Sequence, residues 1–220
     1  MSHIIQAYIE EKTFPKTDTT ILRNLSLEID AGETLVIVGK SGAGKSSLLN
    51  ILGLIDSDFK GTYTLFDTPV ASLDDKTKAA WRNQRIGFVL QESALIQSMT
   101  IEENIKLPLI YATRDDELRA KASFDEIVDS LELRSVLKKT PLECSGGERS
   151  RSVFARGILM KPELVLADEP TASLDGENKE ALIELLFNLN KEYGTTIITV
   201  THDMEFAERH QRIITIVKEG

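Results

Sequence analysis

The amino-acid sequence predicts an α/β fold with a mostly parallel sheet, an N-terminal antiparallel β flap and an inserted helical lobe. Three observations predict it. From residue 35 onward, short apolar segments typical of buried strands alternate with helical segments, as in a parallel sheet covered by helices. The earlier strand-like segments are mixed or alternating in polarity, which favours an antiparallel sheet with one solvated face. Between about 92 and 144 no segment is typical of a strand.

We expect one domain over residues 1–220, with the core at about 1–91 and 150–220 and the helical lobe at about 92–149. This length is sufficient for a single well-buried domain. The first elements are an edge strand at 4–9 and a half-buried strand at 25–29, separated by Phe14, a proline and a polar turn. A turn at 30–33 then leads into a fully apolar strand at 35–38.

That apolar strand enters a segment that fits the phosphate-binding pattern G-x-x-x-x-G-K-[ST], and a helix at 47–52 leaves it. The strand–loop–helix context distinguishes such a loop from a glycine-rich turn with an incidental lysine. Glycines let the backbone N–H groups wrap around phosphate oxygens, and the helix adds its positive end. Lys45 would reach the β- and γ-phosphates, and the Ser46 hydroxyl would ligate Mg²⁺. The nucleotide-contacting residues are therefore predicted to be Gly39, Lys40, Ser41, Gly42, Ala43, Gly44, Lys45, Ser46 and Ser47.

The chain is thus predicted to bind a nucleoside triphosphate on a P-loop NTPase core. Further strands are expected at 61–66, 86–90, 164–167, 196–200 and 213–217, the last closing the sheet. Apolar residues at helical spacing predict helices at 123–133, after Ser145, and around 182–189, and a short polar helix is expected at 76–83.

Polar side chains follow three of the apolar strands, and the ligand of an open α/β sheet lies at these carboxyl ends. Asp168 follows four apolar residues as a Walker B aspartate does, which would help to hold Mg²⁺, and Glu169 could orient or deprotonate a water. The alternative is an acidic pair that caps a helix. Gln91 could bridge the metal and the water or lie in a solvated loop, and His202 could join the site or pack beside a helix capped by Asp203.

A second glycine pair opens a helix at Ser145-Gly146-Gly147-Glu148 and forms a second potential anion site. One phosphate chain needs only one such cradle. The economical interpretation is that this one serves a nucleotide held by another subunit. The alternative is an ordinary turn with a serine N-cap.

Composition excludes several protein classes. The net charge of −9 argues against a broad nucleic-acid-binding face, and 41% hydrophobic residues are usual for a globular protein. The single cysteine, Cys144, excludes an internal disulfide and suits a reducing compartment. No signal-peptide pattern is visible, and no apolar run approaches the roughly 20 residues that span a bilayer. We therefore expect that any membrane crossing belongs to another chain.

Together these motifs resemble the ATP-binding cassette (ABC) ATPase family, over the whole chain from Ile4 to Gly220. The run 144–148 stands where that family has its LSGGQ signature, and 172–175 resembles the D-loop. Gln91 falls at the Q-loop position, His202 at the switch-histidine position, and Phe14 at the aromatic that stacks on adenine. Five ordered motifs are far more specific than any one of them, and they favour the functional interpretation of Gln91 and His202.

The resemblance implies an ATPase in which two cassettes pack head to tail around ATP and Mg²⁺. Each ATP would lie between one subunit's phosphate loop and the signature of the other. It implies trans contacts from Ser145, Gly146, Gly147 and Glu148, with Asp175 coupling the two sites. Glu169 would be the catalytic base, with Lys45 and His202 at the γ-phosphate, and the magnesium ligands would be Ser46, Gln91 and Asp168.

Two signature positions depart from the family pattern. Cys144 replaces leucine, an exchange between apolar residues, and Glu148 replaces glutamine. Glutamate also occurs there in the branch of lipoprotein-releasing, macrolide-exporting and cell-division cassettes, which the chain resembles at 86–91, 103–109 and 166–171. Gln97 stands where that branch often has proline, at the expected docking point of a membrane partner, which leaves the partner's identity open.

The leading hypothesis is a cytoplasmic ATPase subunit, peripheral on the inner face of the cell membrane, that drives a separate integral-membrane permease in export or extraction. It would act as a homodimer or a paired cassette, with no nucleic-acid partner. One alternative is a soluble ABC ATPase, which the absence of a long heptad insert or a tandem cassette disfavours. The other is a signalling or gating subunit of a membrane complex without transport. Copurification with a multi-span protein would favour the first hypothesis over the soluble enzyme.

Overall fold

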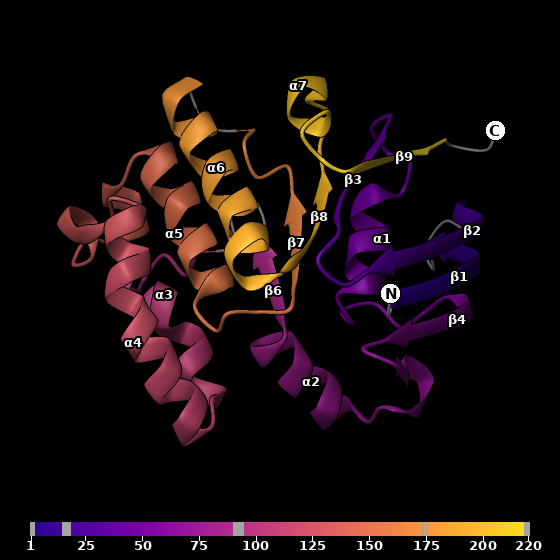
Figure 1. Cartoon of the computed structure of the whole chain (residues 1–220), viewed down its shortest axis with the longest axis horizontal. Coiled ribbons are helices and arrows are strands. Elements are labelled where there is room, and N and C mark those ends of the chain that lie inside the picture. The colour runs from indigo at the N-terminus through magenta and orange to yellow at the C-terminus, as the bar shows by residue number, and fades with distance from the viewer. Residues whose placement is uncertain (1–2, 15–18, 90–94, 173, 175, 218–220) are drawn as a thin grey trace.

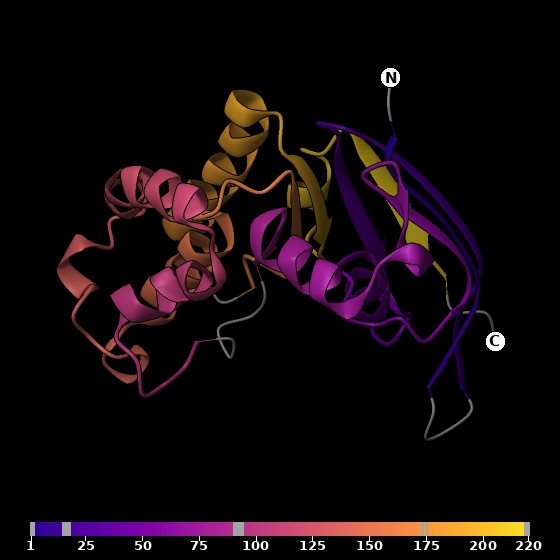
Figure 2. The same ribbon diagram turned by 90° about the horizontal axis from the view of Figure 1, so that it is seen from below.

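The computed structural model describes residues 3–14, 19–89, 95–172, 174 and 176–217, apart from the side chains of Phe14 and Arg119. The described residues form two β-sheets with helices around them (Figure 1). The antiparallel strands lie on one side of the molecule, the parallel strands in the middle and most helices on the far side, as both views show (Figures 1 and 2). The predicted fold class is confirmed.

The antiparallel sheet has the order β2 (Thr19–Asp30), β1 (His3–Phe14), β4 (Lys60–Leu65) and β5 (Thr68–Pro69). The prediction that residues 4–9 form an edge strand is wrong, because β1 pairs with β2 on one side and with β4 on the other. Strands β2 and β5 are the edges instead. The ladder of β2 with β1 is irregular between Lys12 and Thr13, and Asn24 adopts a φ of +48°. This irregularity bends the edge strand near the phosphate-loop segment.

The parallel sheet has the order β6 (Ile86–Val89), β7 (Leu164–Asp168), β8 (Thr196–Val200), β3 (Thr34–Gly39) and β9 (Arg212–Ile216). All four ladders are parallel. Every residue of β8 is buried, as expected for a strand covered on both faces. Strand β9 is the last strand along the chain and an edge of the sheet, and its range is close to the predicted 213–217.

Helix α1 (Lys45–Leu52) packs between the two sheets, where one hydrophobic core joins it to β1, β2, β4 and one face of the parallel strands. Short elements connect the sheets: the 3₁₀ turn η1 (Val70–Ser72) and helix α2 (Asp75–Gln84), close to the predicted 76–83.

A second core covers the opposite face of the parallel sheet. It draws mainly on the longer helices of this side, α3 (Ile101–Lys106), α4 (Arg114–Ser130), α5 (Gly146–Ile158) and α6 (Gly176–Tyr193), with α7 (Met204–Ala207) beside them. The 3₁₀ turns η3 (Leu107–Tyr111), η4 (Arg134–Val136) and η5 (Pro141–Glu143) connect them. The described residues between 95 and 144 contain no strand, as predicted. Among the described residues, no helix combines the length and apolar character needed to cross a bilayer.

Candidate functional site

The loop before α1 requires glycine at two positions. Gly44 is the N-cap of α1 with a φ of +95°, and a Cβ there would lie 2.7 Å from Ile21 Cγ2. At Gly39 a Cβ would lie 2.4 Å from the Ile216 carbonyl oxygen. The loop is therefore fitted closely between β2 and β9, and only glycine allows both the backbone conformation and the approach.

The same loop presents donors at the start of α1. Among the described residues no side chain caps this helix, so its first-turn N–H groups remain available to an anion. The Lys45 ammonium donates to the carbonyl oxygens of Gly39, at 2.8 Å, and Lys40, at 3.2 Å, which holds it over the loop. Ser46 is exposed beside it. The loop therefore offers a phosphate cradle with one positive side chain and one hydroxyl.

The carboxyl ends of β3, β8 and β7 meet in one row. Val200 of β8 pairs with Ile37 on one side and with Asp168 on the other. Ile37 lies two residues before the loop at Gly39, so Asp168 and Glu169 lie at the same edge of the sheet as the phosphate loop. This is the convergence that the sequence predicts for these residues.

Glu169 is held by three contacts from the end of β8. Its N–H donates to the Val200 carbonyl at 2.9 Å, and its carboxylate accepts from the Thr201 hydroxyl at 3.2 Å. The other carboxylate oxygen lies 2.9 Å from His202 Nδ1. Glu169 also has a φ of +49°, an uncommon conformation for a residue with a Cβ. The surrounding structure therefore fixes this carboxylate at the expense of backbone strain.

His202 and Glu169 differ strongly in exposure, since the histidine side chain is 75% exposed and the glutamate side chain 17%. The alternative in which His202 packs beside a helix is therefore wrong, although Asp203 does cap α7 by accepting from the Phe206 N–H at 3.2 Å. The exposed His202 ring and the Asp203 cap therefore occur in the same segment. The imidazole lies at the edge of the site, where it can reach a ligand.

The side chains near the phosphate loop could hold Mg²⁺ if substrate phosphates supplied further ligands. Asp168 is half-buried at the end of β7, and the Ser46 hydroxyl is exposed at the start of α1. In the described part of the chain no three His, Cys, Asp or Glu side chains gather in a way that could hold a metal alone. Mg²⁺ is commonly held by one or two carboxylates together with substrate phosphates, so this donor set fits that ion.

The second glycine pair opens α5 in a capping box. Ser145 Oγ accepts from the Glu148 N–H at 3.2 Å, and the Glu148 carboxylate accepts from the Ser145 N–H at 2.6 Å. The latter hydrogen bond lowers the pKa of Glu148 from its ordinary value. The proposed serine N-cap is thus real, and glutamate is as suitable as glutamine at this position of a capping box.

The two glycine-opened helices belong to opposite sides of the parallel sheet. Helix α1 packs in the core shared with the antiparallel strands, whereas α5 packs in the core of the other face (Figure 1). This separation agrees with the expectation that they do not serve one phosphate chain within one subunit.

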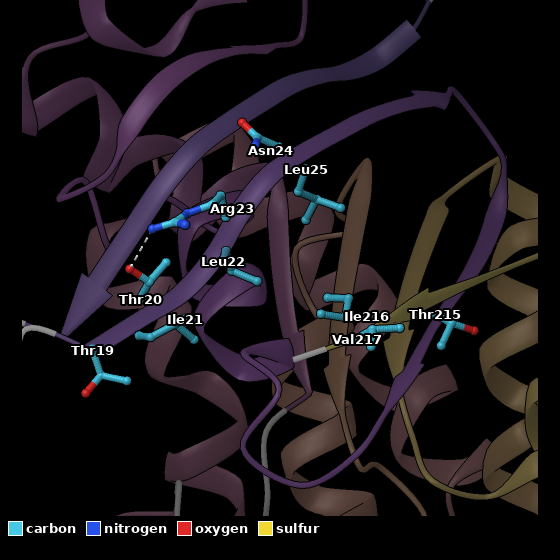
Figure 3. A pocket seen from close by; sticks show the side chains of 10 residues that line it. All are labelled: Thr19, Thr20, Ile21, Leu22, Arg23, Asn24, Leu25, Thr215, Ile216 and Val217. Carbon is cyan, nitrogen blue, oxygen red and sulfur yellow. Dashed lines mark hydrogen bonds between the residues drawn. The ribbon is translucent and has the colours of Figure 1, made fainter. Parts of the chain in front are cut away.

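A cavity of about 670 Å³ lies beside the phosphate loop, between β2 and β9 (Figure 3). Its wall includes Ile21, which abuts Gly44, and Ile216, which abuts Gly39. Another wall residue, Thr19, pairs with Phe14 in the β1–β2 ladder. The backbone of Phe14 therefore lies next to the wall of this cavity.

The family model described as ABC transporter matches residues 22–172. The chain belongs to the ABC transporter family. This ABC chain is 41% identical to the lipoprotein-releasing system ATP-binding protein LolD of Bordetella pertussis, over 87% of this chain and 83% of that protein. It is 40% identical to the macrolide export ATP-binding/permease protein MacB of Campylobacter jejuni over 92% of this chain but only 31% of MacB. The chain thus spans about a third of the MacB-type relatives it matches.

Solved ABC structures agree with the fold. The dimeric structure of MJ0796, a bacterial ABC transporter cassette, superimposes with a TM-score of 0.88 at 33% identity, covering 97% of this chain and 94% of that one. A post-hydrolysis dimer of MJ0796 with ADP and Pi gives a TM-score of 0.85 at 32% identity, covering 98% and 97%. The present chain is therefore an ABC ATPase cassette.

Three predicted site residues of the ABC chain are not placed. Gln91 and Asp175 lie outside the described residues, and for Phe14 only the backbone is described. Their predicted roles at the magnesium ion, between the two sites and on adenine stay predictions.

Sequence reasoning missed several side chains around the site of the ABC chain. Thr201 bonds the Glu169 carboxylate, and Lys179 of α6 forms an ion pair with Asp203. That ammonium lowers the pKa of the Asp203 carboxyl. The ring of His210 bonds the Phe206 carbonyl and the Thr199 hydroxyl, on either side of His202 in the sequence. A threonine directly after an apolar strand was a usable signal for the first, whereas the others depend on contacts between distant elements.

Proposed function

We propose that this ABC cassette binds Mg²⁺–ATP at the phosphate loop and hydrolyses it with Glu169 as the general base. The observation that carries the proposal is the Glu169 carboxylate, fixed between Thr201 and His202 at the sheet edge shared with the loop. A base held in one place beside the γ-phosphate can orient and deprotonate the attacking water.

The other residues take complementary roles. The α1 N-terminus, Lys45 and the loop N–H groups would bind the β- and γ-phosphates, and His202 would hold the γ-phosphate and the water. Asp168 and Ser46 would hold Mg²⁺ with Gln91, and the ion would neutralise developing charge on the phosphate oxygens. Phe14 would stack on the adenine, with the ribose and base toward the cavity between β2 and β9.

We further propose that two cassettes, identical or paired, close head to tail. Ser145, Gly146 and Gly147 of one chain would then contact the γ-phosphate bound by the other chain, with Glu148 of the first chain beside them. The separation of α1 and α5 across the parallel sheet supports a site completed in trans. Asp175 would couple the two sites. The single-domain arrangement, with a lobe at about 92–149 that moves on closure, belongs to the same proposal.

A separate integral-membrane permease is the proposed partner, received between the helical lobe and the segment around Gln91. Beside the helical lobe, a groove of about 350 Å³ lies between α2, β6, η3 and α5. At its rim Tyr111 is 80% exposed and the neighbouring Ile110 66% exposed. Apolar side chains at such exposure suit a helix of a partner chain. The cassette would then lie on the cytoplasmic face of the membrane, and the names of its MacB and LolD relatives favour export or extraction.

The Glu169→Gln variant tests the enzymatic part of the proposal. It removes the base while keeping the side-chain shape and one acceptor for Thr201, so ATP should still bind while hydrolysis is nearly abolished. Light scattering with ATP and magnesium should then show a trapped dimer. A variant that stays monomeric would refute the site shared between two chains, and one that hydrolyses ATP normally would refute Glu169 as the base.

Affinity purification from a membrane extract tests the partner. Recovery of a multi-span membrane protein, lost when Tyr111 is changed to Asp, would support the permease. Leu142→Asp is the matched control, because Leu142 is equally exposed at 80% but lies outside the groove. Turnover stimulated by DNA or ribosomes, without a membrane partner, would instead indicate a soluble ABC ATPase. Recovery of a membrane partner whose gating follows the ATP cycle, without transport, would indicate the signalling subunit.

A further inference from the structure

The ring of His210 bonds residues on both sides of His202 in the sequence. Its Nδ1 lies 3.1 Å from the Phe206 carbonyl oxygen, and its Nε2 lies 3.0 Å from the Thr199 hydroxyl. Because a carbonyl oxygen only accepts, Nδ1 carries the hydrogen, and Nε2 of the neutral ring accepts from Thr199. One imidazole thus joins the end of α7 to strand β8.

The ring is held tightly in this position. His210 is only 7% exposed, and its ring packs against Phe187 of α6 at 5.1 Å and against Phe206 at 5.0 Å between centroids. Both nitrogens have a partner, so any other orientation would leave buried polar groups unsatisfied. These contacts therefore define one orientation of the ring.

This junction stands directly before the residues that fix Glu169. Thr199 is followed by Val200, Thr201 and His202, and each of these three contacts Glu169. On the other side of the segment, the Phe206 that receives the Nδ1–H also donates its own N–H to Asp203. The position of the His202 segment is therefore set at both ends by groups that His210 bonds.

We propose that His210 is a positioning residue for hydrolysis, which acts through Thr199 and Phe206 to keep His202 and Thr201 on the Glu169 carboxylate. The inference rests on the proposed role of Glu169 as the base. His210 does not reach the nucleotide in this account, so its loss lowers the rate of the chemical step and leaves ATP binding unchanged.

Two threonine variants, one in β8 and one directly before it, test the link. Thr199→Val removes the hydroxyl that donates to His210 Nε2. Thr195→Val removes another buried hydroxyl, which donates to the Pro162 carbonyl at 3.1 Å; Thr195 lies directly before β8. For Thr199→Val we expect kcat to fall about tenfold with KM for ATP within about twofold, since a small misplacement of reacting groups is costly. Thr195→Val should show the same modest loss of melting temperature and an unchanged kcat.

The histidine itself provides the rescue experiment. His210→Ala should reduce kcat as Thr199→Val does, and the double variant should be no worse than either single one, since both break the same contact. His210→Gln can still reach Thr199 with its side-chain amide and should recover most of kcat. Circular dichroism and thermal unfolding of each variant show whether it is folded before its kinetics are compared.

Two outcomes separate this inference from the proposed function. If the wild-type chain hydrolyses ATP, Glu169→Gln does not, and yet both His210→Ala and Thr199→Val keep the wild-type kcat, the positioning role is wrong while the proposed function stands. An equal fall in kcat for Thr199→Val and Thr195→Val would also overturn it, because it would show a general loss of stability rather than the loss of one contact. If Glu169→Gln hydrolyses ATP normally, the proposed function fails first.

Discussion

The fit of Gly44 between α1 and β2 makes Gly44→Ala a sharp test of the phosphate-loop geometry. The added Cβ would lie 2.7 Å from Ile21 Cγ2, 2.8 Å from Leu22 Cδ2 and 3.1 Å from the Ile21 carbonyl oxygen. At a φ of +95° alanine also loses about 1 kcal/mol relative to glycine. Overpacking against the half-buried Ile21 and the buried Leu22 adds about 1–3 kcal/mol. We therefore expect the free energy of unfolding to fall by about 2–4 kcal/mol.

Gly42→Ala is the matched control in the same loop. Gly42 also has a positive φ, +75°, but a Cβ there would meet no atom of the described residues within 4 Å. Only the conformational part of the cost applies, about 1 kcal/mol. The difference between the two variants therefore isolates the steric contact with β2.

Urea denaturation at equilibrium, extrapolated linearly to water, measures both values. For a chain of this size, each 1 kcal/mol corresponds to a shift in melting temperature of about 2–4 °C, which a thermal scan can check. Equal destabilisation of the two variants would refute the close packing of β2 against the loop. A Gly44→Ala variant as stable as wild type would refute the left-handed conformation as well.

Three other predictions follow from buried or capped groups. Tyr63→Phe removes a buried hydroxyl that donates to the Leu52 carbonyl at 2.7 Å, and it should lower the free energy of unfolding by about 1–3 kcal/mol in urea titrations; an unchanged value would contradict the bond. Burial lowers the pKa of His210 below its ordinary 6.5, with adjacent Arg209 as a minor contributor, so the unfolded chain takes up the proton first as pH falls. Stability should therefore decrease as pH drops below about 6.5, and His210→Gln should flatten that dependence in urea titrations at several pH values; an identical slope in the variant would refute it. Glu148→Gln keeps the capping box, so its melting temperature should change by less than about 2 °C, and loss of the negative charge should lower the ATP concentration needed for dimerisation by light scattering. Weaker dimerisation would contradict that expectation.

The local elements were predictable because their signals are local. The phosphate loop, the apolar strands and the buried face of α5 each follow from residues within one or two turns of each other. Helix α4 shows the limit of that signal. It begins at Arg114 after its cap Thr113, earlier than the predicted 123, because its first turns are mostly polar and carry no apolar periodicity.

Which strands pair with one another was harder to predict than where the strands lie in the sequence. The segment at 4–9 forms a strand as predicted, yet it lies between β2 and β4 because hydrogen-bond partners far along the chain decide which strand is an edge. The same applies to the irregular stretch of β2 near Ile21, which nothing in its own residues reveals.

The fold class, the family, and the residues of the phosphate loop and the strand ends can be read from the amino-acid sequence, because those motifs are contiguous and their chemistry needs fixed residue types. What holds the Glu169 carboxylate follows only from the packing of β7, β8, α6 and α7, which brings Thr201 and His202 to the carboxylate and the His210 ring to Thr199. The tertiary structure also shows that the two glycine-opened helices lie across one sheet. Such relations depend on which elements pack together, and no spacing along the chain records them.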